Sequence, residues 1–136
     1  MIDEYHTQIP RIRGTDYKEV SKRARILYKE ISSKTKRRPY IRSVFFKKEK
    51  IFLDYFWSHL QSKNWKDRLR RLKYYECALD LIMNTRTAPF IIKNRHNNSE
   101  VFYRFTGLTR NRERFFVQIK ENTRRREKSF ISVFPE

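Results

Sequence analysis

The stretch EVFYRFTGLTRNRERFFVQIKENTRRREKSFISVFPE, residues 100–136, decides the fold. It contains three short runs rich in aromatic and β-branched residues, and the polar segments TRNRE (109–113) and TRRRE (123–127) separate them. Runs of this length that are bounded by turn residues predict antiparallel strands. A shorter run, PFIIKN at 89–94, predicts one more strand. We therefore expect a sheet of three to four antiparallel strands.

Alternation along these runs sorts the side chains onto two faces of the sheet, because successive residues of a strand point to opposite sides. We expect the more apolar set of each strand, such as Phe115, Val117 and Ile119, or Ile131 and Val133, to face the helices. The opposite face then combines cations, an amide and hydroxyls with phenylalanine rings. Its predicted members are Arg104, Thr106, Gln118, Lys120 and Ser132, bordered by Phe102, Phe116, Phe130 and Phe134.

Upstream of residue 89, apolar residues recur at helical spacing. The first stripe follows Asp16 and Glu19, which have the spacing of a capping box at a helix start. The predicted helices span about 17–32, 49–62 and 65–84, KTKRR at 34–38 is expected to be a loop, and 40–46 has strand character.

Helices followed by a meander of strands predict an α+β fold. We expect N-terminal basic helices packed on a C-terminal antiparallel sheet of three to four strands. The chain has the length of one domain, 1–136, and no linker-like segment interrupts it. Within it, 1–66 would be a basic helical part and 67–136 a helix followed by the sheet.

Charge points to the class of partner. The chain has 33 Lys and Arg residues against 15 Asp and Glu, a net charge of +18, and 15% aromatic residues. Such an excess repels itself unless a polyanion relieves it, and the aromatic content is too high for a disordered tail. We expect nucleic acid, RNA more than DNA, with an anionic membrane surface as the main rival.

The sequence predicts a cytoplasmic protein that does not enter a membrane. No apolar stretch approaches a membrane span, and the first residues lack the basic and apolar regions of a signal peptide. The single cysteine, Cys77, lies among apolar residues and is expected in the core. Neither a metal nor a cofactor is expected, because the sequence has no HExxH, Cys/His quartet or P-loop.

Several cations outside the sheet are candidate phosphate contacts. The first helix has a basic face, which serves either as a phosphate-binding ridge or as a solvated surface. Positive charge in the first turns of the third helix opposes the helix dipole, which indicates a ligand there. The predicted nucleic-acid contacts are Lys22 and Arg25 on the first helix, Lys36 and Arg37 in the loop, Arg68 and Arg71 on the third helix, and Phe116, Gln118, Arg125 and Lys128 in the sheet region.

The segment from Asp67 to Pro135 resembles the phage-associated members of the small ribonuclease and toxin group of barnase, EndoU, colicin D, colicin E5 and RelE. The features that carry the resemblance are a helix, then a proline-containing segment, Ala88-Pro89-Phe90, then paired strands, and a last strand with a hydroxyl residue, Ser132 in FISVFP. The resemblance covers about half of the chain. It implies a RelE-like, metal-independent endoribonuclease of toxin type.

In that group a base deprotonates the ribose 2′-hydroxyl, cations stabilise the phosphorane and an acid protonates the leaving oxygen. The resemblance implies that Arg104 and Lys120 stabilise charge, while Ser132 and Thr106 orient phosphate. The base is not marked by a motif. His59 is the best of the histidines, although its apolar helix face is also typical of a core histidine.

The resemblance implies two kinds of partner: an RNA, ribosome-bound or transfer RNA, and an acidic antitoxin or immunity protein. The alternative hypothesis is a non-catalytic RNA- or DNA-binding module, carried by a mobile element or associated with ribosomes. That module would use the same surface for binding alone.

Overall fold

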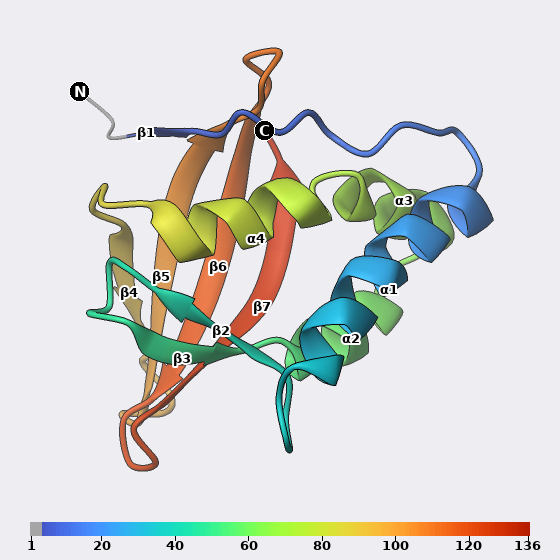
Figure 1. Cartoon of the computed structure of the whole chain (residues 1–136). Helices are drawn as coiled ribbons and strands as arrows, with labels where there is room; N and C mark the ends of the chain where they lie inside the picture. Colours follow the sequence, from blue (N-terminus) through green and yellow to red (C-terminus); the bar gives the residue numbers. More distant parts are fainter. Residues whose placement is uncertain (1–3) are drawn as a thin grey trace.

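The computed structural model describes residues 4–136, which form four helices and one sheet of seven strands (Figure 1). The elements in chain order are β1 Glu4–His6, α1 Tyr17–Ser33, β2 Tyr40–Ser43, β3 Glu49–Phe52, α2 Asp54–Gln61, α3 Trp65–Leu72, α4 Tyr75–Asn84, β4 Phe90–Lys93, β5 Glu100–Leu108, β6 Arg114–Asn122 and β7 Glu127–Pro135.

The sheet is larger than predicted and it is mixed. Its order is β1-β5-β6-β7-β3-β2, and β4 also pairs with β5. The β1 strand runs parallel to β5 and β3 runs parallel to β7, whereas the other pairs are antiparallel. The prediction of N-terminal helices on a C-terminal antiparallel sheet of three to four strands is therefore wrong. The N-terminal part contributes three strands to the same sheet.

The additional strands pair with the two edges of the β5–β6–β7 sheet. The edge of β5 pairs with β4 along Val101–Arg104 and with β1 along Thr106–Leu108. The β3 strand joins β7 at Lys128 and Ser129. Residues 49–52 were predicted as the start of a helix, but they form the second strand of a hairpin closed by Lys47 and Lys48 with positive φ. Ile51 is fully buried in this strand.

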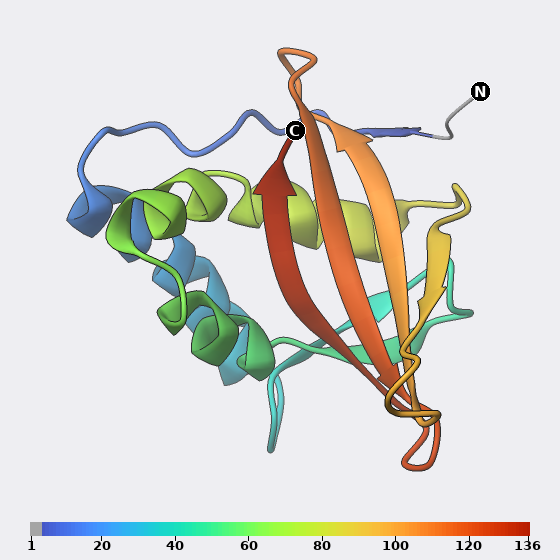
Figure 2. The ribbon, with the colours of Figure 1, turned by 180° about the vertical axis from the view of Figure 1, so that it is seen from behind.

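The helices agree better with the sequence. In α1, Asp16 caps the helix by accepting a hydrogen bond from the Lys18 N–H at 3.2 Å, which confirms the predicted start. The predicted helix at 65–84 is divided in two at Lys73 and Tyr74. The second part, α4, crosses one face of the sheet, called here the inner face (Figure 1). The opposite, outer face of β5, β6 and β7 has no helix across it (Figure 2).

The core lies between α4, α2 and the inner face. Phe56 of α2 stacks on Phe130 of β7, with ring centroids 4.7 Å apart and an interplanar angle of 8°. Phe105 and Phe115 are also buried there. Gly107 allows close packing, since a Cβ atom at this position would lie 2.5 Å from Cζ of Phe115. These contacts hold α2 against the inner side of β7.

A β-bulge changes the facing of β7. Gln118 lies opposite Ser132, but the next residue, Ile119, lies opposite Phe130, so that Ile131 is the extra residue. Phe130 therefore points into the core and is fully buried. Its predicted place beside the polar face is wrong, because simple alternation does not account for an inserted residue.

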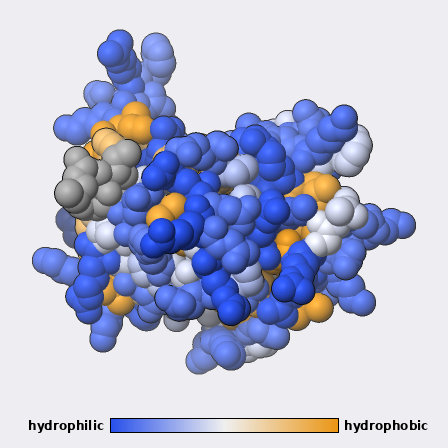
Figure 3. All heavy atoms as spheres, turned by 90° about the horizontal axis from the view of Figure 1, so that it is seen from above, coloured by the Kyte–Doolittle hydropathy of each residue, from blue (hydrophilic) through white to orange (hydrophobic). Residues whose placement is uncertain are grey.

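Within the part of the chain that the structure describes, no helix combines the length and apolar character needed to cross a membrane. Seen from above, the surface is mainly hydrophilic, with apolar side chains interspersed (Figure 3). Cys77 is fully buried, and burial raises the pKa of its thiol to about 12.

Candidate functional site

Polar and aromatic side chains form three rows across the outer face of β5, β6 and β7. Residues that lie opposite one another in a sheet point to the same side, so the register defines each row. The bulge places both Ser129 and Ser132 on this face, although they are three residues apart. The rows are Phe102, Lys120 and Ser129 nearest the β6–β7 turn, Arg104, Gln118 and Ser132 in the centre, and Thr106, Phe116 and Phe134 beyond them.

Arg71 of α3 reaches the central row from the side of β7. Its Nη1 donates a hydrogen bond to Oγ of Ser132 at 2.6 Å, and its Nε donates to Oδ2 of Asp67 at 3.0 Å. Burial alone would raise the pKa of Asp67, yet hydrogen bonds from Arg70 and Arg71 hold that pKa below its ordinary value. The ionised carboxylate therefore fixes the guanidinium at the edge of the outer face.

Arg104 supplies a second guanidinium in the centre of the face. Its Nη2 lies 3.4 Å from Oε1 of Gln118, and its Nε is buried with no hydrogen-bond partner within residues 4–136. Arg71 and Arg104 both flank the ring of Phe134, with Cζ atoms 5.5 Å and 5.6 Å from its centroid. Two guanidinium groups thus share one aromatic ring, an arrangement that concentrates positive charge at the centre of the face.

His59 lies at the rim of the face, on α2. The helix begins at Asp54, so that Phe56 and Leu60 face the core while His59 is only half-buried. Burial, together with the positive charges of Lys63, Arg71 and Lys120, lowers the pKa of the imidazole below its ordinary value. A neutral imidazole can accept a proton at neutral pH, as a general base must.

Lys120 connects this rim to a small cavity. Its Nζ lies 5.7 Å from the centroid of the Tyr55 ring and 3.4 Å from Oε2 of Glu100. Arg125, in the β6–β7 turn, contributes a further cation. A cavity of about 120 Å³ is lined by Tyr55, Lys120, Asn122, Arg125, Glu127 and Ser129.

The two predicted phosphate-orienting hydroxyls are covered. Thr106 is 3% exposed, between Glu4 of β1 and Phe116 of β6 in the register. Ser132 is 5% exposed, and its hydroxyl accepts the hydrogen bond from Arg71. Ser132 therefore positions Arg71, and Thr106 packs below the surface.

Some predicted contacts lie elsewhere. Lys128 is 8% exposed and its Nζ lies 2.6 Å from Oε2 of Glu49 and 3.7 Å from Oε2 of Glu121. Arg68 donates hydrogen bonds of 2.8 Å to the backbone oxygens of Gln61 and Lys63, and so holds the loop between α2 and α3. Both cations are engaged within the protein.

The cations of the N-terminal helix form a separate group. Views from both sides show α1 on the inner-face side of α2 and α3 (Figures 1 and 2). Arg25 lies with its Cζ 4.4 Å from the centroid of the Trp57 ring, and Lys22 is exposed. Lys36 and Arg37 are exposed in the loop that follows. The structure does not bring these four residues to the outer face.

The structure therefore collects one group of predicted residues and disperses the rest. Tyr55, Asp67 and Ser129 were not predicted as site residues. The sequence does contain a signal for Tyr55: it lies one helical turn before His59, so the polar ends of both side chains are expected on the same side of the helix. The group on or beside the outer face comprises His59, Arg71, Arg104, Phe116, Gln118, Lys120, Arg125 and Ser132.

Within residues 4–136, no three His, Cys, Asp or Glu side chains cluster in a way that could hold a metal ion. The chain matches no family model, no curated protein and no solved structure in the comparisons with known proteins.

Proposed function

We propose that this protein binds RNA on the outer face of the sheet and cleaves it without a metal ion, by attack of the ribose 2′-hydroxyl on the adjacent phosphate. The observation that carries the proposal is a half-buried His59 at the rim of the outer face, close enough to Arg71 and Lys120 for their charges to add to burial in lowering its pKa. Arg71 in turn shares the ring of Phe134 with Arg104. A base and several fixed cations are the groups that this reaction requires.

Each group has a role in the proposed step. Neutral His59 accepts the proton of the 2′-hydroxyl, and the 2′-oxygen forms a bond to phosphorus. Negative charge on the phosphorane is stabilised by Arg71, Arg104 and Lys120. The bond from phosphorus to the 5′-oxygen breaks as that oxygen takes up a proton from water, and protonated His59 returns its proton to the solvent. The products are a 2′,3′-cyclic phosphate and a free 5′-hydroxyl.

The aromatic residues of the face support RNA as the ligand. Phe116 and Phe134 lie with centroids 5.4 Å apart on the outer face, beside the guanidinium of Arg104. Unpaired bases stack on such rings, while neighbouring cations hold the phosphates. The resemblance of residues 67–135 to small ribonucleases and toxins points in the same direction and implies a cytoplasmic protein with an acidic antitoxin or immunity protein as partner.

The test is to incubate the purified protein with structured RNA and with ribosomes in excess EDTA, and to examine the RNA ends. We expect fragments with 2′,3′-cyclic phosphate ends, and we expect His59→Gln to abolish them without loss of RNA binding. RNA that is bound but stays intact under both conditions would refute cleavage. That outcome would identify the protein as a non-catalytic binding module instead.

A further inference from the structure

We propose that the β2–β3 hairpin and the β6–β7 turn form a second RNA subsite, which holds the strand outside the cleavage site. This inference rests on the proposed function, because the occupant is a flanking part of the same single-stranded RNA. We call this subsite the hairpin platform. Its residues are Tyr40, Arg42, Lys50 and Phe52 of the hairpin, with Arg125 and Arg126 of the turn.

The hairpin presents rings and cations together on one face. Tyr40 lies opposite Phe52 and Arg42 opposite Lys50, so that all four side chains are on the same side of the two strands. Lys50 Nζ is 4.7 Å and Arg42 Cζ is 5.5 Å from the centroid of the Tyr40 ring, and the two rings are 6.2 Å apart. Arg42 and Lys50 are exposed. Interleaved rings and cations suit the bases and phosphates of a single strand.

A hollow of about 490 Å³ joins the hairpin to the turn. Its two carboxylates are already paired, since Glu49 contacts Lys128 and Glu127 contacts Arg38. The charges that remain in the hollow are therefore positive. Its lining residues are Glu49, Lys50, Phe52, Arg125, Arg126 and Glu127.

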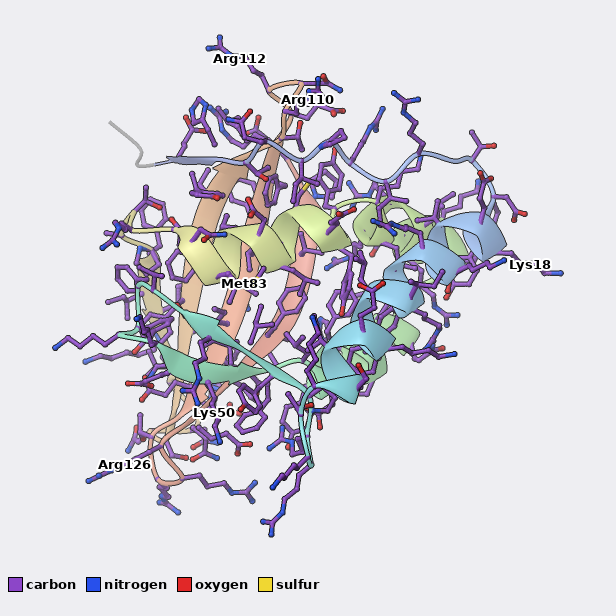
Figure 4. The ribbon with its side chains drawn as sticks, in the orientation of Figure 1. Lys18, Lys50, Met83, Arg110, Arg112 and Arg126 are labelled. Carbon is purple, nitrogen blue, oxygen red and sulfur yellow. The ribbon has the colours of Figure 1, made fainter. Side chains whose placement is uncertain are left out.

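The hollow leads to the candidate cleavage site. Arg125 and Glu127 line both this hollow and the 120 Å³ cavity beside Lys120. A strand that leaves Lys120 thus passes the β6–β7 turn directly onto the hairpin platform. Lys50 and Arg126 lie at the same end of the molecule, and Arg110 and Arg112 lie at the opposite end (Figure 4).

Arg126 of the hairpin platform and Arg112 at the opposite end of the molecule share an unusual backbone conformation (Figure 4). Among residues 4–136, every residue other than glycine with a positive φ is Lys or Arg: Lys47, Lys48, Arg112 and Arg126. Glycine adopts this region without steric cost, whereas a side chain is strained there. The turns therefore carry cations at positions where glycine would relieve strain.

These observations favour RNA over an acidic protein. The rings of Tyr40 and Phe52 are only partly buried, and cations lie against both of them, Lys50 and Arg42 on Tyr40 and Arg38 on Phe52 at 4.2 Å. Base stacking uses such ring faces, whereas carboxylates need the cations alone. An RNA long enough to contact both the cleavage site and the hairpin platform should therefore bind more tightly than a short one.

The test compares Arg126→Gly with Arg112→Gly, a matched control. Both variants remove one charge and relieve one positive-φ side chain, so both should fold with at least the thermal stability of the original protein. Binding is measured by fluorescence anisotropy with single-stranded RNAs of about 4 and about 12 nucleotides, which lie within the range of site sizes of single-strand binding modules. The RNAs carry 2′-deoxy substitutions that prevent cleavage.

We expect the longer RNA to bind more tightly than the shorter one, and Arg126→Gly to weaken only the longer. Its salt dependence, as log K against log salt, should become shallower by about 0.7, the value for one phosphate contact on a single strand. Tyr40→Ala should weaken the longer RNA about 5- to 150-fold, the effect of losing one base stack. Arg112→Gly should leave this affinity difference unchanged.

Four outcomes would overturn the inference. Equal weakening by Arg126→Gly and Arg112→Gly would show that only net charge matters. Equal affinity of the original protein for both RNAs, with cleavage intact, would refute the platform but leave the proposed function standing. Competition by poly-glutamate that depends on Arg126, without any length effect for RNA, would assign the platform to an acidic protein. Failure to bind either RNA would refute the proposed function as well.

Discussion

Replacing Arg71 by Ala tests whether the outer face is a reaction site. The substitution removes the donor to Oγ of Ser132 and one of the two donors to Asp67. Ser132 is 5% exposed, and a buried polar group left without a partner costs about 1–3 kcal/mol. Asp67 keeps its contact with Arg70 at 2.9 Å. The free energy of unfolding should therefore fall by about 1–3 kcal/mol, the cost of that one unsatisfied group.

The expected effect on cleavage is larger. Loss of one fixed donor that stabilises developing charge typically lowers kcat by about 10²–10³-fold. Arg70→Ala is the matched control, since Arg70 belongs to the same helix and the same carboxylate, but its side chain is 55% exposed. Arg70→Ala should cleave RNA at the original rate. Arg71→Lys should cleave RNA at an intermediate rate, because lysine keeps the positive charge but lacks the planar guanidinium with its several donors.

Urea unfolding measures the stability of each variant, and single-turnover cleavage of a defined oligoribonucleotide in EDTA measures the reaction. The rates are compared at a temperature where all variants are folded. Arg71→Ala and Arg70→Ala with equal cleavage rates would refute the assignment of Arg71 to the phosphorane charge. A folded Arg71→Ala variant that loses RNA binding entirely would assign Arg71 to binding rather than to the reaction.

Three further predictions concern His59, Gly107 and Cys77. The pKa of His59 is lowered from 6.5 in the folded protein, so the unfolded chain binds more protons as the pH falls below 6.5, and acid should reduce the free energy of unfolding. His59→Gln should make the free energy of unfolding, measured with urea, less dependent on pH in this range. An unchanged pH dependence would contradict the lowered pKa of His59. Gly107→Ala would place a Cβ 2.5 Å from Cζ of Phe115, so the free energy of unfolding measured with urea should fall by about 1–3 kcal/mol. An unchanged free energy of unfolding would mean that the Phe115 ring moves aside without cost. Cys77 has a pKa raised to about 12, so a colorimetric thiol reagent at neutral pH should react only on unfolding, and an immediate reaction would argue against its burial.

The sheet illustrates how far alternation alone can lead. Along β6, the period of two correctly separated Phe115, Val117 and Ile119 from the outer face, because the ladder with β5 is regular and the inserted residue of the other ladder belongs to β7. The same rule failed at Phe130, because the bulge inserts a residue and local sequence does not mark it.

Short strands with distant partners were beyond sequence reasoning. The β1 strand has three residues, too few to display a period, and its partner on β5 is about a hundred positions away. Ile51 was assigned to a helix, because its neighbours also fit helical spacing; its pairing with Lys128 of β7 decides the matter. Such pairings depend on which edges the rest of the sheet leaves open.

The candidate site was predictable where it depends on strands. Arg104, Gln118 and Lys120 follow from alternation, and the structure places them on one face. The contact between Arg71 and Ser132 joins residues 61 positions apart, and no local pattern in the sequence pairs them. The role of Tyr55 depends on α2 beginning at Asp54, and the apolar spacing placed that start too early.

The bulge at Ile131 also bears on how this strand tolerates changes in length. Upstream of it, Ser129 faces outward and Phe130 inward; downstream, Ser132 faces outward and Val133 inward. Deleting Ile131 would restore strict alternation while every other residue of β7 keeps its face. Deleting Phe130 or Ser132 would also restore alternation, but Ile131 would then replace a ring in the core or a hydroxyl on the outer face. Ile131 is thus the residue that β7 can lose while it keeps both its core side chains and its outer-face hydroxyls.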